Sequence, residues 1–530
     1  MKMELVTVTA LLLIFGVLVV GLSPLVPDGS RFTYVERFFP SDRVIDIYVE
    51  LAPDDLEDIF TNPLREEYKD AVVTIDGVTV KHVGFRTKGN SSLRMVARSD
   101  SNRYSFKIDF DQYIKGQSLA GLTKLNLNNS MSDPSYMREH LSYELLAEMG
   151  IPSPAVGYAN LYINGELHGL YVTVEGIEES FLWRTYGAPL GNLYKASEGT
   201  DLVYREDQDE QASTLKLVVG SKTTPDQKVN AMVKALATGE DLESYLNVDQ
   251  LLRYFAVNTV LVNLDSYVGT FAHNYYLYEQ DGVFTILPWD YNMSFAGFGG
   301  TPYLSIDTPT QGVSLESRPL LGSLLAKEEY KERYYRYLEE IINEHFTVEK
   351  MTEKINRLAV LIRPHVEADP TKFFSMEQFE ASLGSGSSSA ITSNRTRGAM
   401  RGGMMGMMGG STIGLTQFVT ERIQSIKAQL AGEVTQQSSA QSPFPGPMPQ
   451  FPQFRGNNPM GNQAFRGQWE MPPNMAPPPG VERMPRQMPD RMRTEANVIS
   501  SVYIATIGAG LALIAIACLF FLKIRNKYSI

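Results

Sequence analysis

Residues 263–292 read NLDSYVGTFAHNYYLYEQDGVFTILPWDYN, and the fold prediction starts from this stretch. An apolar run with helical period, 248–264, ends directly before Asp265. Alternating apolar and aromatic residues then flank the Asp-Gly pair at 281–282, a dipeptide that favours a tight hairpin turn. The second strand of this hairpin ends at Asp290. We therefore expect a helix, a hairpin and two carboxylates exposed where these elements end.

The residue types at these element ends suggest phosphoryl-transfer chemistry. His273 and Asn274 lie between the two aspartates, which stand 25 positions apart. One acid can accept a proton from a hydroxyl group, while the amide and the other acid hold Mg²⁺ together with the phosphates of a nucleotide. Taken singly, either aspartate is better explained as a cap or a turn residue.

The rest of the chain changes character midway. Up to about residue 200 it alternates like strands joined by turns, at 44–51, 71–80, 83–89, 104–110, 124–129, 158–165 and 169–176. One helix is expected at 135–149, after Asp133 and Pro134. Beyond 225 the apolar period is helical, at 226–237, 248–264, 326–345, 348–363 and 412–430. These patterns predict an α+β fold with a β-rich front lobe, 32–200, and an α-rich rear lobe, 201–430.

A polar turn after one predicted strand is a candidate phosphate-binding loop. It contains Gly89, Asn90, Ser91 and Ser92. Glycine permits close approach of backbone N–H groups to phosphate oxygens, and the hydroxyl groups add donors. A plain polar turn is the commoner explanation of such a stretch, because the stretch matches no established nucleotide-binding pattern.

Lys107 is a candidate phosphate ligand from the strand 104–110. Phe106, Ile108 and Phe110 fill one face of that strand, so Lys107 lies on the other face together with Asp109. A lysine there can pair with phosphate oxygens as a point charge. Without further context, a solvated strand lysine is the simpler interpretation.

Taken together, the motifs resemble those of a known family. They occur in the order Gly89-Asn-Ser-Ser92, Tyr104–Phe110, Leu125-Asn-Leu127, the helix that carries Arg138, Leu161–Tyr171 with Glu175, Asp265, His273-Asn274 and Pro288-Trp-Asp290. This ordered set resembles the CotH kinase family, a group of atypical, secreted protein kinase-like proteins that includes spore coat protein H. The resemblance covers about 40–430.

The resemblance implies a divergent, bilobal protein kinase fold that binds ATP with Mg²⁺ or Mn²⁺ and phosphorylates Ser or Thr of exported proteins. Asp265 would be the catalytic acid, and Asp290 with Asn274 would hold the metal. Lys107 would bind the nucleotide phosphates, although Arg103 is an alternative, and Gly89, Asn90, Ser91, Ser92 and Glu175 complete the expected nucleotide-binding set. The glutamate that orients the lysine stays open among Glu139, Glu144 and Glu148.

The two ends of the chain predict export and membrane attachment. Residues 1–23 are typical of a signal peptide or an N-terminal anchor, and 498–522 form an uncharged run long enough for a transmembrane helix. Basic residues in 523–530 predict a cytoplasmic tail, so the main domain would face outward at the cell membrane. Residues 431–496 are rich in Pro, Met and Gln and are expected to form a disordered tether.

The composition of the chain argues against several other classes of function. The net charge of −12 opposes a general nucleic-acid binder, and Cys518 is the only cysteine, so disulfide and Cys-type zinc chemistry lack ligands. A glycine- and methionine-rich stretch, 384–410, is expected to be a mobile loop and carries thioethers that can bind Cu(I). The main prediction is a membrane-tethered, outward-facing protein kinase with ATP and an exported protein as partners. The alternatives are an inactive kinase-like module for binding or coat assembly and a metal-binding envelope protein.

Overall fold

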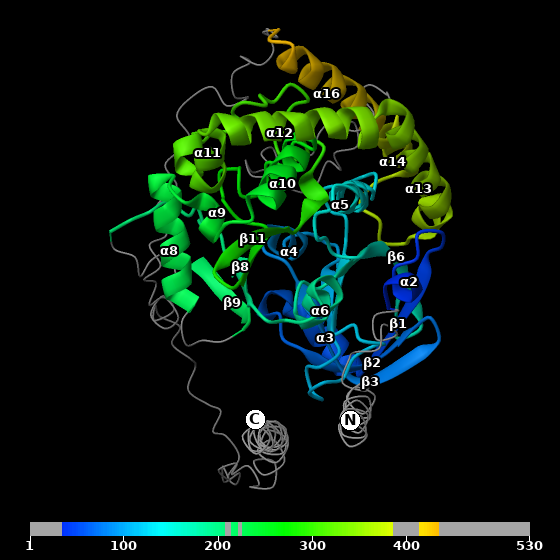
Figure 1. Ribbon diagram of the computed structural model, residues 1–530. Helices are drawn as coiled ribbons and strands as arrows, with labels where there is room; N and C mark the ends of the chain where they lie inside the picture. Colours follow the sequence, from blue (N-terminus) through cyan, green and yellow to red (C-terminus); the bar gives the residue numbers. More distant parts are fainter. Residues whose placement is uncertain (1–33, 207–213, 221–224, 385–412, 434–530) are drawn as a thin grey trace, which may run out of the picture. The chain divides into compact units, whose positions relative to one another are not determined.

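The computed structural model describes residues 34–206, 214–220, 225–384 and 413–433 (Figure 1). All of them belong to one of the two compact units of the chain, 1–448, and the other unit, 449–530, lies outside the described residues. The predicted segments at 1–23, 498–522 and 523–530 also lie outside them, as do nearly all of 384–410 and 431–496. Within the described ranges, no helix is both long enough and apolar enough to cross a membrane.

The β-rich region forms a closed barrel. Its strands, in spatial order, are β1 (Ile45–Leu51), β2 (Lys69–Ile75), β3 (Val78–Lys88), β4 (Ser105–Asp109), β5 (Lys124–Asn128), β7 (Glu166–Glu175) and β6 (Val156–Ile163). Parallel pairing of β1 with β6, from Ile45 opposite Ala159 to Val49 opposite Ile163, closes it. The α+β class is thus confirmed, but this region is a seven-stranded barrel and not a clear kinase lobe.

The prediction of a single strand at 71–80 is wrong, because these residues form a hairpin of two strands. β2 ends at Ile75 and β3 starts at Val78. Asp76 and Gly77 between them both have positive φ, 49° and 75°. They are an Asp-Gly pair like that at 281–282, and this backbone conformation is the one that a two-residue hairpin turn requires.

The barrel strands have an inner and an outer face. Their inward residues form one hydrophobic core that includes Val83, Phe85, Phe106, Ile108 and Leu127. Residues alternate between the faces of a strand, so the outer face of β3, β4 and β5 carries polar side chains. These are Arg86 and Lys88 of β3, Lys107 of β4, and Asn126 and Asn128 of β5.

A second hydrophobic core supports the α-rich half. Its helices are α5 (Arg138–Glu148), α6 (Glu179–Tyr186), α8 (Pro225–Thr238), α9 (Leu242–Tyr245), α10 (Val248–Val260), α11 (Pro319–Leu325), α12 (Glu328–Glu340), α13 (Val348–Ala368), α14 (Met376–Leu383) and α16 (Leu415–Leu430). α12 packs on α10 (Figure 1). The helices α2 (Tyr34–Phe38), α3 (Pro53–Thr61) and α4 (Ser91–Val96) belong to the barrel region.

A four-stranded sheet belongs to the α-rich half. Its spatial order is β11 (Val283–Pro288), β10 (Tyr275–Gln280), β8 (Asn192–Ala196) and β9 (Leu215–Val219). The β10–β11 hairpin and its turn at 281–282 confirm the sequence prediction. Because β8 pairs with β10, the α-rich half starts before residue 200, earlier than predicted.

The helix expected at 135–149 starts later than predicted, at Arg138. Asp133 does act at its start, since its carboxylate accepts hydrogen bonds from the backbone N–H groups of Ser135 and Arg138 at 3.0 and 2.9 Å. The turn that these bonds close delays the first helical residue.

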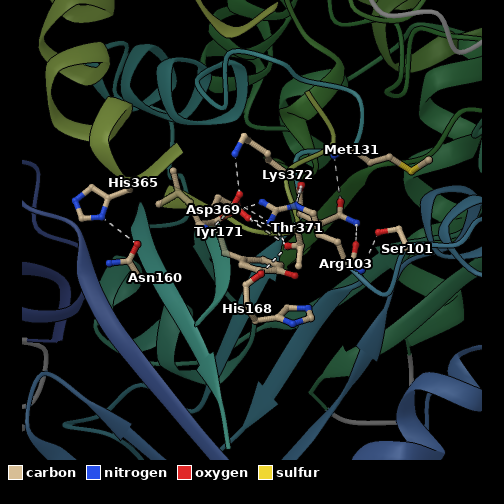
Figure 2. A network of polar contacts seen from close by, with 12 residues as sticks. Ser101, Arg103, Met131, Asn160, His168, Tyr171, His365, Asp369, Thr371 and Lys372 are labelled. Carbon is tan, nitrogen blue, oxygen red and sulfur yellow. Dashed lines mark hydrogen bonds and ion pairs between the residues drawn. The ribbon is translucent and has the colours of Figure 1, made fainter. Parts of the chain in front are cut away.

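A buried ion pair joins the barrel to the end of α13 (Figure 2). The side chains of Arg103 and Asp369 are both 0% exposed and lie 2.7 Å apart. Arg103 also donates to the carbonyl oxygens of Asn129 and Leu170, and Asp369 accepts the N–H of Leu170 at 2.9 Å. A Cβ at Gly169 would lie 2.4 Å from both charged groups, so only glycine leaves room for the pair.

Candidate active site

The loop after α10 holds Asp265 by both carboxylate oxygens. The His273 ring nitrogen Nε2 lies 2.8 Å from Oδ1, and the Asn274 amide donates to Oδ2 at 3.2 Å and to the backbone oxygen of Asp265 at 2.9 Å. Asn274 has a φ of 57°, a left-handed conformation that asparagine tolerates and that directs its amide back to the loop. The carboxylate is therefore fixed in orientation while it stays partly exposed.

The contact with Asp265 changes the pKa of the His273 ring. Burial disfavours its charged form, but the hydrogen bond and the charge of Asp265 outweigh burial and raise the pKa of His273. A protonated ring would donate to Asp265 and strengthen the contact. His273 thus positions the Asp265 carboxylate.

Arg318 supports the same loop from behind. Its guanidinium is buried and donates to the carbonyl oxygens of Gly269 and Thr270. A Cβ at Gly269 would lie 1.7 Å from the backbone oxygen of Leu264, so this turn requires glycine. The loop is rigid at its far end, which limits movement of Asp265.

Asp290 follows β11 and stands at the open end of the hairpin. Its φ is 59°, and its backbone N–H donates to the Tyr143 hydroxyl at 3.1 Å. Among the described residues, no side chain forms an ion pair with its carboxylate within 4.0 Å. Burial raises the pKa of Asp290, Lys88 opposes the rise, and Asp265 adds to it.

Lys88 ends β3 on the outer face of the barrel and starts a hydrogen-bonded chain. Its ammonium donates to Asn128 Oδ1 at 2.7 Å, and the Asn128 amide donates to Glu139 Oε2 at 2.7 Å. Burial lowers the pKa of Lys88, although Asp290 and Glu139 oppose this. Burial, and then the charge of Asp290, raises the pKa of Glu139 to about 7.

These contacts distinguish the three glutamates that the sequence left open. Glu139 is 3% exposed and bonds to the chain that starts at Lys88. Glu144 pairs with Arg357 at 2.7 Å, and Glu148 pairs with Lys354 at 2.6 Å. Glu139 is therefore the glutamate that lies near Lys88 and Asp290, and these three side chains are termed the cluster.

Lys107 lies near the cluster but has a carboxylate partner. Its ammonium lies 3.1 Å from Glu178, which also pairs with Lys124. Its charge lowers the pKa of Lys88, after the larger effect of burial. Arg103, the alternative to Lys107, is consumed by the buried pair with Asp369 and has no exposed surface for a phosphate.

The remaining predicted nucleotide-binding residues fall into two places. Gly89 and Asn90 follow Lys88, and Ser91 and Ser92 are the first residues of α4; Gly89 has a φ of 127°. Glu175 is fully buried, pairs with Arg184 at 2.6 Å, and accepts bonds from Tyr34 and from the backbone of Ala155. Its contacts are those of a structural carboxylate, and none of them joins it to the chain that starts at Lys88.

Sequence reasoning missed Lys88 and Asn128. Lys88 directly precedes the Gly89 turn, and its outward position follows from strand parity with the buried Phe85. The parity of this strand is therefore the signal that could have found Lys88. No such signal existed for Asn128, because its role depends on the hydrogen bond to Glu139 of α5.

The donor set fits a divalent cation held together with phosphates. An Asp290 carboxylate without an ion-pair partner and the amide oxygen of Asn274 are hard oxygen donors. No group of three or more His, Cys, Asp or Glu side chains within the described ranges forms a closed metal cluster. Mg²⁺ at a nucleotide site needs few protein ligands, because phosphates and water supply the others.

Comparison with known proteins identifies the family of this chain. Residues 85–388 match the family described as CotH kinase protein. The inner spore coat protein H of Bacillus subtilis is 28% identical over 295 residues, which cover 53% of this chain and 78% of that protein. An inner spore coat protein H-like protein of the same organism is 24% identical over 295 residues, 55% of this chain and 83% of that protein. The family match spans more than half of the sequence, so this chain belongs to the CotH kinase protein family.

Proposed function

We propose that this protein is a metal-dependent protein kinase that transfers the γ-phosphoryl group of ATP to Ser or Thr of exported or envelope proteins. The observation that supports it best is that Lys88 on the barrel lies close to the charged side chains of the α-rich half. The Lys88–Asn128–Glu139 chain comes from the barrel and α5, and Asp265 and Asp290 come from the α-rich half. Lys88 and Asp265 lie close enough to Asp290 for their charges to shift its pKa, after the larger effect of burial.

In this proposal each residue has one task. Lys88 binds phosphate oxygens, and Glu139 holds Lys88 in place through Asn128. Asp290 and Asn274 hold Mg²⁺ or Mn²⁺, which when bound neutralises phosphate charge. The turn Gly89–Ser92 borders the phosphates, and Lys107 adds positive charge.

Asp265 is the group that would receive the acceptor proton. The Ser or Thr oxygen attacks the γ-phosphorus, the bond from that phosphorus to the β–γ bridging oxygen breaks, and ADP leaves. The hydroxyl proton passes to Asp265, whose orientation His273 and Asn274 fix.

The location is part of the same proposal. The names of both relatives refer to the spore coat, which favours an exported or coat-associated acceptor. Membrane attachment through 498–522, with the main domain outside and the last residues inside, stays a prediction from the sequence.

The test is transfer from γ-labelled ATP with Mn²⁺ by the purified full-length chain, to a generic acceptor protein or to itself. Asp290→Ala should abolish the signal. Asp281→Asn, in the hairpin turn, is the control and should leave it unchanged, because asparagine accepts the same backbone conformation. Equal phosphorylation by the wild type and Asp290→Ala would refute the proposal. Nucleotide binding without transfer by the wild type would favour an inactive kinase-like module for coat assembly, a second role that the names of the relatives support.

A further inference from the structure

Lys195 is a lysine of the small sheet that no predicted role includes. It lies in β8, opposite Tyr276 of β10. Its ammonium is 5.7 Å from the centre of the Tyr276 ring and 5.8 Å from the centre of the Trp289 ring. The Lys88 ammonium is 5.7 Å from the same Trp289 ring. One indole is therefore contacted by ammonium groups from two different sheets.

The place of Lys195 in the sheet brings it to the open end of the hairpin. Tyr276 follows Asn274 by two residues, and Trp289 directly precedes Asp290. Both candidate metal ligands thus border the two aromatic rings that Lys195 contacts. A phosphate bound to a metal at Asp290 would come close to the Lys195 ammonium.

Lys195 also lacks a counter-ion. In the part of the chain that the structure describes, no carboxylate lies within 4.0 Å of its ammonium, whereas Lys107 has Glu178 and Lys124 has Glu178 and Asp109. The side chain stays accessible to solvent. Although the side chain as a whole is exposed, protein atoms packed around the ammonium group, followed by the charges of Lys88 and Lys107, lower the pKa of Lys195 to about 8. An anion beside this amine would relieve the repulsion among these lysines.

We propose that Lys195 is a second phosphate-binding lysine, which together with Lys88 holds the terminal phosphates of the nucleotide and makes the site prefer triphosphates over monophosphates. This inference rests on the proposed kinase function. Lys88 acts from the barrel side and is already bonded to Asn128. Lys195 acts from the hairpin side and has a free charge for the outer phosphates.

The aromatic contacts give Lys195 a structural explanation as well, because cation–π contacts stabilise a sheet face by themselves. The two explanations differ in what they predict. A structural lysine affects the melting temperature and all ligands alike. A phosphate ligand affects affinity in proportion to the number of phosphates.

The experiment measures dissociation constants of adenosine, AMP, ADP and ATP with Mn²⁺ for the full-length wild type, Lys195→Met and Lys195→Arg. Lys195→Met should weaken ATP binding about tenfold or more and leave adenosine and AMP within about twofold. Lys195→Arg should restore most of the ATP affinity, because it keeps the charge. Lys81→Met, an exposed lysine of β3, controls for the change in net charge.

The outcomes separate the two proposals. If the wild type prefers ATP over AMP and Lys195→Met keeps the same preference, the role of Lys195 is refuted while the kinase proposal stands. If Lys195→Met weakens all four ligands equally together with the melting temperature, Lys195 is structural and the inference is also refuted. If the wild type binds none of these nucleotides, the kinase proposal fails, and the role of Lys195 fails with it.

Discussion

Two groups of charged side chains connect the barrel with the α-rich half, and they are built in opposite ways. In the Arg103–Asp369 pair, both side chains are fully buried, and backbone groups together with the Thr371 hydroxyl provide their further hydrogen bonds (Figure 2). In the cluster of Lys88, Glu139 and Asp290, no two charged groups form a direct ion pair within 4.0 Å, and the pKa values of all three are shifted by burial. A closed pair holds the structure together. A cluster with unmet charge is suited to a ligand, which in the proposed function is a phosphate with a metal ion.

The largest expected effect is on turnover at Asp265. Asp265→Asn keeps the shape of the side chain but cannot accept the acceptor proton, so the transfer rate should fall about 10³-fold. Nucleotide affinity should change less than about threefold, because Asp265 does not hold the phosphates. Single-turnover transfer and ATP titration measure the two effects. A loss of ATP binding that matches the loss of rate would assign Asp265 to the metal or the nucleotide instead.

The next effect is on stability at the closed pair. Asp369→Asn leaves Arg103 charged and buried without a counter-ion, which should lower the free energy of unfolding by about 3 kcal/mol. Urea unfolding followed by circular dichroism measures this. Asp100→Asn, an exposed aspartate three residues before Arg103, is the control and should change stability by less than about 0.5 kcal/mol. Equal stability of the two variants would show that the pair does not hold the halves together.

A smaller effect is expected in the pH dependence of stability without ligand. The pKa of Glu139 is about 7 in the fold, above its ordinary value of 4.5, so the folded state binds the extra proton between these values. The free energy of unfolding should then fall by roughly 2 kcal/mol as the pH rises through this window. Glu139→Gln should remove this part of the decline, measured by urea unfolding at pH 5 and pH 7.5 in EDTA. The same decline in both proteins would mean that Glu139 is charged throughout.

The smallest effect concerns Lys107, which is near the cluster but paired. Because Glu178 already neutralises it, Lys107→Ala should weaken ATP binding only about fivefold, or about 1 kcal/mol. Lys115→Ala, at an exposed position, should have no effect. A loss larger for Lys107→Ala than for Lys88→Ala would restore Lys107 as the principal phosphate lysine.

The sequence predicted the hairpin site because the information there is local. A turn dipeptide at 281–282 fixes the pairing of β10 with β11, so Asn274 and Asp290 must emerge at the same end. Asp265 is held beside the hairpin by its contacts with His273 and Asn274, which lie only 8 and 9 residues further along the chain. Short-range pairing of this kind can be derived from patterning alone.

The barrel side of the cluster was not predicted, because it depends on distant contacts. Barrel closure needs β1 to pair with β6, more than 100 residues along the chain, and no alternation pattern carries that register. Glu139 could not be separated from Glu144 and Glu148 until the packing of α5 was known. The sequence prediction named Lys107, with Arg103 as the alternative, and did not consider Lys88, because the strand pattern shows which face a lysine occupies but not which carboxylate reaches it.

The most direct test of the account removes one cation from each charge group and measures both stability and transfer. Full-length Lys88→Met should melt within about 2 °C of the wild type and lose phosphoryl transfer about 100-fold or more, since its charge serves the ligand. Arg103→Met should lower the free energy of unfolding by about 3 kcal/mol, and its folded fraction should still transfer phosphate. If Lys88→Met instead unfolded as readily as Arg103→Met and its folded fraction transferred phosphate at the wild-type rate, the cluster would be structural and the account would be contradicted.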